Sequence, residues 1–174
     1  MELWELNLGL CERFSKHVFC TQPTKGGSMY RVPRYTISLV REGSIGVETK
    51  TVRGSATARE ILAPVFDGLD REQCVVMVLD AKHKVIGLNV VSVGSLNVSI
   101  VHPREVFKPA ILLNAAAVIL AHNHPSGDTT PSEEDHALTK RLQEAGKCLG
   151  IPLLDHLVLG DHGTFWSFAD QRLL

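Results

Sequence analysis

The chain contains 174 residues, of which 44% are hydrophobic and 21% are charged. This composition supplies enough apolar material for one compact core and predicts one principal domain. The 18 Lys and Arg residues against 19 Asp and Glu residues give a formal net charge of −1. That balance excludes the broad positive field of proteins that bind nucleic acid mainly through phosphates, although it allows a small basic patch.

The sequence lacks the features of membrane and secreted proteins. Its most apolar stretch, 115–121, is far shorter than a membrane-spanning helix. The N-terminus has no basic start followed by an apolar stretch, so it does not resemble a secretory signal. We therefore expect a soluble, cytoplasmic protein that does not bind membranes. The cysteines lie far apart without a Cys-x-x-Cys pair, which predicts isolated, buried thiols. They are Cys11, Cys20, Cys74 and Cys148.

The N-terminal region differs in composition from the rest. Residues 1–30 mix apolar and charged side chains and end in the turn formers of 21–28, so we interpret them as an appendage and linker before a domain at 31–174. The appendage either packs on the domain or contacts another protein, and the sequence does not decide between these. Two strand-like runs, 35–40 and 45–52, flank a short turn and predict a β-hairpin.

The remaining pattern alternates strands with helices. Thr57 and Glu60 have the spacing of a capping box before a short apolar-faced helix that reaches Phe66. Further helices are predicted from Pro103 to Asn114 and over 132–149. This order predicts an α+β domain with one central sheet. Strands are predicted at 74–79, 85–93, 96–101, 115–121, 153–159 and 164–168.

A cluster of metal-ligand residue types follows the strand predicted at 115–121. His122 and His124 are two residues apart, and side chains at this spacing project to the same face of an extended backbone. The polar loop 125–131 lets the chain reverse, so Asp135 in the first turn of the next helix points back toward the strand end. Two histidines and one carboxylate with an open fourth position form the ligand set of a hydrolytic zinc site. The sequence therefore predicts Zn²⁺ at these three residues.

Each part of this motif also has a structural interpretation. Ser132 and Asp135 have the spacing of a helix capping box, and a His-x-His pair also occurs as ordinary polar strand residues. Neither interpretation explains the combination of both features, which favours a metal site. The consecutive letters of His122, Asn123 and His124 match the name of the HNH nucleases only by coincidence, because that motif is spread over a hairpin and a helix.

The spacing resembles that of the JAB/MPN (JAMM) metalloproteins, whose pattern is His-x-His-Pro, Ser eight residues after the second His, and Asp three residues further on. Here His124, Ser132 and Asp135 have this spacing. More narrowly, residues 55–174 resemble the RadC-like branch, also called the DNA repair protein RadC family. The motifs that carry the narrower resemblance are 103–107, 114–116, 122–127, 131–135 and 154–156.

The resemblance implies a JAB/MPN-like, cytidine-deaminase-like fold with a mixed, largely antiparallel sheet flanked by helices. It also implies that Glu72 acts as the general base and that Ser132 donates a hydrogen bond to the tetrahedral oxyanion. From the residues alone, Glu72 would be interpreted as a solvated loop carboxylate. Glu105 is the alternative base, although an acidic residue in the first turn of a helix also suits the helix dipole.

The other histidines are less informative. His156 lies in an apolar segment after Asp155, where it is either a hydrogen-bond partner of a metal ligand or an ordinary core histidine. His136 is expected at the protein surface. The histidines without metal-ligand spacing are His17, His83, His102 and His162.

These observations predict a Zn²⁺-dependent hydrolase of the metallopeptidase or isopeptidase type, acting on a peptide or protein of unknown identity, with a link to DNA repair implied by the family name. The alternatives are a DNA-transaction accessory protein that works by binding, and a metal-dependent nuclease that uses the same site. Longer family members carry an N-terminal helix-hairpin-helix DNA-binding module. The sequence contains no such segment, and its near-neutral charge predicts weak direct DNA binding. The sequence predicts no particular oligomeric state.

Overall fold

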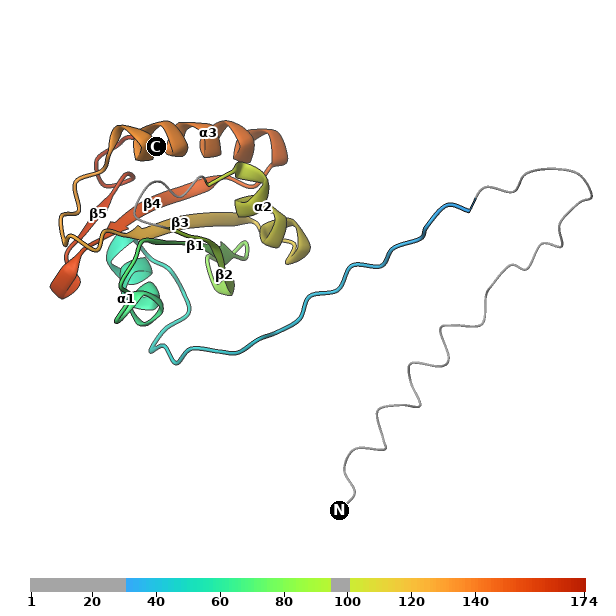
Figure 1. The fold of residues 1–174 in the computed structure, drawn as a ribbon, viewed down its shortest axis with the longest axis horizontal. Coiled ribbons are helices and arrows are strands. Elements are labelled where there is room, and N and C mark those ends of the chain that lie inside the picture. Colours follow the sequence, from blue (N-terminus) through green and yellow to red (C-terminus); the bar gives the residue numbers. More distant parts are fainter. Residues whose placement is uncertain (1–30, 95–100) are drawn as a thin grey trace, which may run out of the picture. The chain divides into compact units, whose positions relative to one another are not determined.

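The computed structural model describes residues 31–94 and 101–174. From Leu39 onward these residues belong to one compact unit, in which helices cover both faces of a five-stranded sheet (Figure 1). The predicted α+β class with one central, mostly antiparallel sheet is confirmed. The elements in chain order are α1 (Ser55–Phe66), β1 (Gln73–Leu79), β2 (Val85–Val93), α2 (Pro103–Leu112), β3 (Ala117–Asn123), α3 (Glu133–Leu149), β4 (Leu153–Leu159), the 3₁₀ helix η1 (Asp161–Gly163) and β5 (Phe165–Ser167).

The sheet has the strand order β2-β1-β3-β4-β5, and all neighbours are antiparallel except β3 and β4. The central strands β1 and β3 are apolar over almost their whole length because both of their faces are covered. Cys74 of β1 lies opposite His122 of β3, and His122 lies beside Val158 of β4. The end of β3 that carries His122 is therefore enclosed by strands on both sides.

Alternate residues of each central strand enter two separate cores. On one face, the side chains of Cys74, Val76 and Val78 pack with residues of α2 and α3. On the other face, Val75 and Met77 pack with residues of α1. Since strand side chains alternate between faces and His122 is paired with Cys74, the His122 side chain projects toward the face covered by α3.

Local sequence signals set both ends of α3. Ser132 is the N-cap, and its side chain accepts a hydrogen bond from the backbone of Asp135, whose carboxylate in turn accepts one from the Ser132 backbone. Gly150 ends the helix in the left-handed conformation at φ 70°, which glycine adopts without steric cost. The predicted helix at 132–149 is confirmed, and its capping box fixes where Asp135 lies relative to the preceding loop.

The predicted hairpin of 35–40 and 45–52 is wrong. Residues 31–50 contain no regular strand, and the apolar side chains of this segment, such as Tyr35 and Ile37, are exposed. At the end of the second predicted strand, Thr51 forms an isolated bridge with Lys84, and Val52 is buried against the sheet. Alternation of apolar and polar residues indicates only that a strand could form, and a two-stranded hairpin without a further packing partner has little stability.

Three other predictions have different outcomes. The capping box at Thr57 is wrong, because the N-cap of α1 is Gly54, three residues earlier. Cys74 is buried as expected, but Cys148 is exposed on α3. The predicted strand at 96–101, the appendage at 1–30 and the thiols it contains lie outside the described residues, apart from the buried Val101. None of the described helices is long and apolar enough to cross a membrane.

Candidate metal centre

The candidate centre lies where β3 ends and the chain enters the loop toward α3. His122 is in β3 and His124 follows directly after it, so their rings project to the same side of the strand. The two Nε2 atoms are 3.1 Å apart. The strand thus presents two imidazole nitrogens to one point in space, as the His-x-His spacing predicts.

Asp135 completes the cluster from the first turn of α3. Its Oδ1 atom lies 3.3 Å from Nε2 of His122, and its Oδ2 atom lies 3.8 Å from Nε2 of His124. The capping box orients this carboxylate, because the backbone N–H and the hydroxyl of Ser132 donate to Oδ2 at 2.8 and 2.7 Å. The helix cap and the metal-ligand geometry are therefore properties of the same side chain.

The spacing of these three donors fits a zinc ion. Two ligand atoms that each lie about 2.0–2.1 Å from a tetrahedral zinc ion are about 3.4 Å apart. The separations of 3.1, 3.3 and 3.8 Å lie on both sides of this value, although a different Asp135 oxygen lies near each histidine. One ligand atom from each residue lies within 4.8 Å of the others. The donor set of two imidazoles and one carboxylate is also one that zinc commonly accepts.

The protonation of His124 supports a cation site. Its Nδ1 atom lies 2.6 Å from the backbone carbonyl oxygen of Asp128. A carbonyl oxygen can only accept a hydrogen bond, so Nδ1 carries the proton and the neutral ring has a bare lone pair on Nε2. That lone pair faces His122 and the Asp135 carboxylate. Burial opposes ionisation of Asp135, but the hydrogen bond and charge of His122, with the bonds from Ser132, lower the pKa of this carboxyl below its usual value.

His156 of β4 lies directly behind His122. The ring of His156 is 0% exposed, and its Nε2 atom is 2.9 Å from Nδ1 of His122. Its other nitrogen is 2.7 Å from the hydroxyl of Thr139, and its ring stacks on Phe168 with centroids 4.9 Å apart. Burial lowers the pKa of His156 well below its usual value, so this imidazole is neutral. His156 is therefore a core residue that also contacts a candidate ligand.

The two candidate bases lie in different surroundings. Glu72 directly precedes β1, and its backbone carbonyl oxygen accepts a hydrogen bond from Gly94. Burial raises the pKa of the Cys74 thiol, and the carboxylates of Glu72 and Asp135 raise it further. Glu105 is exposed in the first turn of α2 and pairs with its neighbour Arg104 at 3.4 Å.

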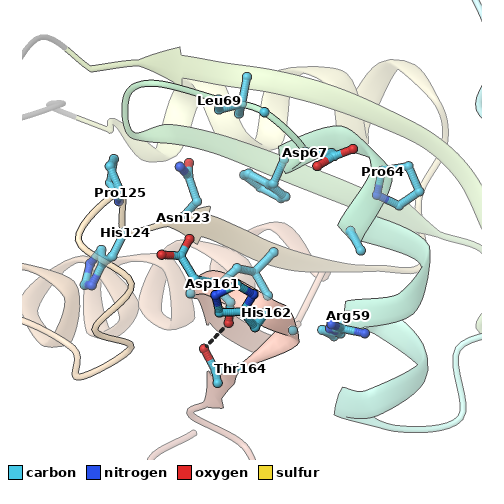
Figure 2. Close-up of a pocket in the computed structure, with 16 residues that line it drawn as sticks. Arg59, Pro64, Asp67, Leu69, Asn123, His124, Pro125, Asp161, His162 and Thr164 are labelled. Atoms are coloured by element: carbon cyan, nitrogen blue, oxygen red, sulfur yellow. Dashed lines mark hydrogen bonds between the residues drawn. The ribbon is translucent and has the colours of Figure 1, made fainter.

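A cavity of about 690 Å³ adjoins the His124 side of the cluster. Figure 2 shows His124 and Pro125 at one side of this cavity and Arg59 of α1 at the other, with Asp161 between them. Loops from three parts of the chain converge here, so no local motif in the sequence indicates it. Its polar lining residues are Arg59, Asp67, Asn123, His124, Asp161, His162 and Thr164.

The sequence also gave no role to Asp128 or Thr139, which hold the outer nitrogens of the histidine cluster. In the sequence, Thr139 is distinguished only by its position one helical turn after Asp135, where its hydroxyl can lie near the same site. His136 is exposed, as expected, and its ring meets the edge of Phe168. His83, His102 and His162 lie outside the group of His122, His124 and Asp135.

Comparison with known proteins identifies the family. The model of the RadC-like JAB domain matches residues 52–173. The chain belongs to this family. The extent of the match agrees with the range of 55–174 over which the motifs resemble it, and it includes the whole histidine cluster. The helices and sheet described above are thus those of a RadC-like JAB domain.

Curated relatives of this JAB domain carry the name UPF0758 protein. The relative from Moorella thermoacetica is 58% identical over 106 residues, which is 61% of this chain and 46% of the relative. That from Symbiobacterium thermophilum is 56% identical over 115 residues, covering 66% of this chain and 49% of the relative. That from Methanococcoides burtonii is 48% identical over 122 residues, covering 70% and 53%. The chain thus spans about half the length of these relatives.

Proposed function

We propose that this chain is a zinc-dependent hydrolase that cleaves an amide bond in a peptide or protein, as a metallopeptidase or isopeptidase. The observation that carries this proposal is the convergence of two imidazole nitrogens and a carboxylate at 3.1–3.8 Å. Three acceptor groups at such distances repel one another unless a cation or proton lies between them. The open side of the cluster borders a cavity, which would leave room for a substrate carbonyl.

Zinc held by His122, His124 and Asp135 would polarise a carbonyl group and make water acidic enough to attack near neutral pH. In this proposal Glu72 accepts the proton from the attacking water and delivers it to the departing amine. Its position directly before β1 supports the role, because Cys74 at that end of the strand lies opposite His122. A general base must reach the water by a hydrogen bond, and the exposed Glu105 already pairs with Arg104.

Ser132 would donate a hydrogen bond to the carbonyl oxygen as negative charge develops there. Its hydroxyl now donates to Oδ2 of Asp135, and the Ser132 backbone N–H donates to the same oxygen. The hydroxyl could therefore rotate toward a substrate while the backbone N–H keeps Asp135 in place. This dual bonding supports a combined role for Ser132 in capping α3 and in assisting the reaction.

The cavity beside His124 is the proposed entry for the substrate. A volume of about 690 Å³ lies within the range of small-molecule and peptide side-chain pockets. Apolar residues such as Phe66 and Leu159 share its lining with charged groups from Arg59 and Asp161. We propose that a peptide segment binds along this cavity with its scissile amide next to His124.

The first test combines zinc content with hydrolysis. We expect about one zinc ion per wild-type chain and loss of zinc in His124→Ala and Asp135→Ala, measured by elemental analysis of folded protein. Glu72→Gln should retain zinc and lose about 10²–10⁴-fold in hydrolysis, as is typical of acid-base groups. Hydrolysis is measured by mass spectrometry on a peptide library that includes isopeptide-linked peptides. Glu105→Gln is the matched control and should keep both properties.

Three outcomes would contradict the proposal. A wild-type chain that binds no zinc when zinc is supplied would exclude the hydrolase. If Glu105→Gln lost hydrolysis by about 10²–10⁴-fold and Glu72→Gln lost none, the general base would be Glu105. Cleavage of DNA that Asp135→Ala abolishes, without peptide hydrolysis, would replace the peptidase by a nuclease.

A further inference from the structure

A continuous row of hydrogen bonds lies behind His122. The Thr139 hydroxyl oxygen is 2.7 Å from the backbone carbonyl oxygen of Asp135 and 2.7 Å from Nδ1 of His156. Nε2 of His156 is 2.9 Å from Nδ1 of His122. The three residues whose side chains form this row are buried: His122 and Thr139 are 2% exposed and His156 is 0% exposed. Water therefore does not compete for these bonds.

The direction of each bond follows from the donors available. The carbonyl oxygen of Asp135 can only accept, so it takes the single proton of the Thr139 hydroxyl. The Thr139 oxygen must then accept from His156, which places the proton of that neutral ring on Nδ1. The bare Nε2 of His156 in turn accepts from His122, whose proton therefore lies on Nδ1. A neutral His122 ring with its proton on Nδ1 therefore presents the lone pair of Nε2 to a cation held between His124 and Asp135.

The rings in this row have fixed orientations. The Phe168 ring stacks on His156 at an interplanar angle of 11°, which holds the plane of the imidazole. His122 of β3 and His156 of β4 lie on neighbouring parallel strands, in which Leu120 pairs with His156. A flip of the His156 ring about its Cβ–Cγ bond would put carbon atoms in place of both nitrogens and would break the hydrogen bonds to Thr139 and His122.

We propose that Thr139 and His156 are positioning residues that fix the tautomer of His122, so that its Nε2 atom stays available as a ligand. The inference rests on the proposed zinc site and extends it to a residue that touches neither metal nor substrate. Without the Thr139 hydroxyl, Nδ1 of His156 loses its acceptor and the ring can carry its proton on Nε2. That proton would then be donated to Nδ1 of His122, which moves the His122 proton onto the ligand nitrogen.

The test compares two substitutions at Thr139 in the 174-residue chain. Thr139→Val has the same shape without the hydroxyl, and Thr139→Ser retains the hydroxyl. We expect Thr139→Val to raise the zinc dissociation constant about 10- to 100-fold, the range found for partners of metal-bound histidines. Thr139→Ser should remain close to wild type. The measurement is competition for zinc with a chelating dye, and circular dichroism confirms that each variant is folded.

A second measurement reads the tautomer directly in the metal-free protein. Long-range ¹H–¹⁵N correlation spectra should show the proton of His156 on Nδ1 in the wild type, and a shift of that proton toward Nε2 in Thr139→Val. Ser167→Ala is the matched control, since it removes a buried hydroxyl that bonds to Asp155 outside this row. A proton on Nε2 of wild-type His156, or equal zinc affinity of Thr139→Val and wild type, would overturn the inference. A chain that binds no zinc but shows the expected tautomers would overturn only the proposed function.

Discussion

The two histidines of the candidate metal centre are two residues apart, yet different parts of the molecule hold them. His122 lies in β3, is 2% exposed, and its outer nitrogen bonds to a buried side chain from another strand. The His124 side chain is 19% exposed, lies just beyond the strand, and its outer nitrogen bonds to a carbonyl oxygen in its own loop. The Nε2 atom of His122 is thus oriented by a buried side chain of the core, whereas the Nε2 atom of His124 is oriented by a local turn.

This difference assigns separate tasks to the two sides of the centre. The His122 side is packed between β1, β4 and α3, where a ligand is held in one geometry and water is excluded. The His124 side borders the cavity and the polar loop, so substrate and water would arrive there (Figure 2). A hydrolytic centre needs both a rigid set of ligands and one open approach, and a strand end next to a loop supplies them.

The largest expected effect separates the two histidines by their contribution to stability. In the metal-free chain, His122→Ala should lower the free energy of unfolding by about 1–3 kcal/mol, because it leaves a buried nitrogen of His156 without a donor. His124→Ala should change it by only about 0.5 kcal/mol, as is typical of sites near the surface. Urea denaturation with a chelator present gives both values, while zinc content should fall in both variants. Equal destabilisation by the two variants would contradict the division between a buried and an open side.

A smaller effect should come from the contact that positions the loop of His124. A Cβ atom at Gly160, directly after β4, would lie 2.5 Å from the carbonyl oxygen of Gly127 and 2.7 Å from Thr129. Gly160→Ala should displace this loop and with it the Asp128 carbonyl that fixes the His124 ring. We expect the zinc dissociation constant to rise about tenfold, in the range for disturbed ligand partners. Dye competition for zinc measures it.

Gly43→Ala is the control for this substitution, because a Cβ atom there meets nothing within 4 Å. It should leave zinc affinity unchanged. In Gly160→Ala the Nδ1 proton of His122 should also remain in place, since the row behind that ring does not include the loop. A change at His122 with none at His124 would show that the two sides are coupled through the sheet instead of being held separately.

Much of this architecture is predictable because its signals are local. The apolar runs of β1 and β3 indicate strands covered on both faces. The spacing of His122, His124 and Asp135 needs only a strand, a reversal and a capped helix to become a cluster. Since each of these steps depends on a few neighbouring residues, the candidate ligands could be named from the sequence.

The parts that could not be predicted depend on contacts between distant segments. Thr139 and His156 meet because α3 crosses β4, a relation that no spacing in the chain reveals. The cavity beside His124 needs α1, the β3–α3 loop and η1 to converge. The strand predicted at 35–40 was wrong for the opposite reason. Its apolar and polar residues alternate as in a strand, but its side chains are exposed and it pairs with no described strand.

The smallest effect concerns Asp155, the charged residue next to His156 on the buried side. Burial raises the pKa of Asp155 above its usual value, despite hydrogen bonds from Ala169, Ser167 and the His156 backbone. A group with a raised pKa in the folded state takes up a proton there first, so acidification favours the fold until the unfolded chain is protonated as well, near pH 4. The free energy of unfolding of the wild type, relative to Asp155→Asn, should therefore rise by less than about 1 kcal/mol between pH 7 and pH 4.

Asp80, in the exposed turn between β1 and β2, supplies a control of opposite sign. Hydrogen bonds from the backbone of Lys84 and Lys82 lower the pKa of Asp80, so its contribution to stability is present above the unfolded pKa and is lost as the pH falls. The wild type should therefore lose stability relative to Asp80→Asn over the same acidification. Urea denaturation at several pH values measures both pairs. If both pairs changed in the same direction, the charge of Asp155 would not carry a cost of burial, and the region behind His122 would be better solvated than its packing indicates.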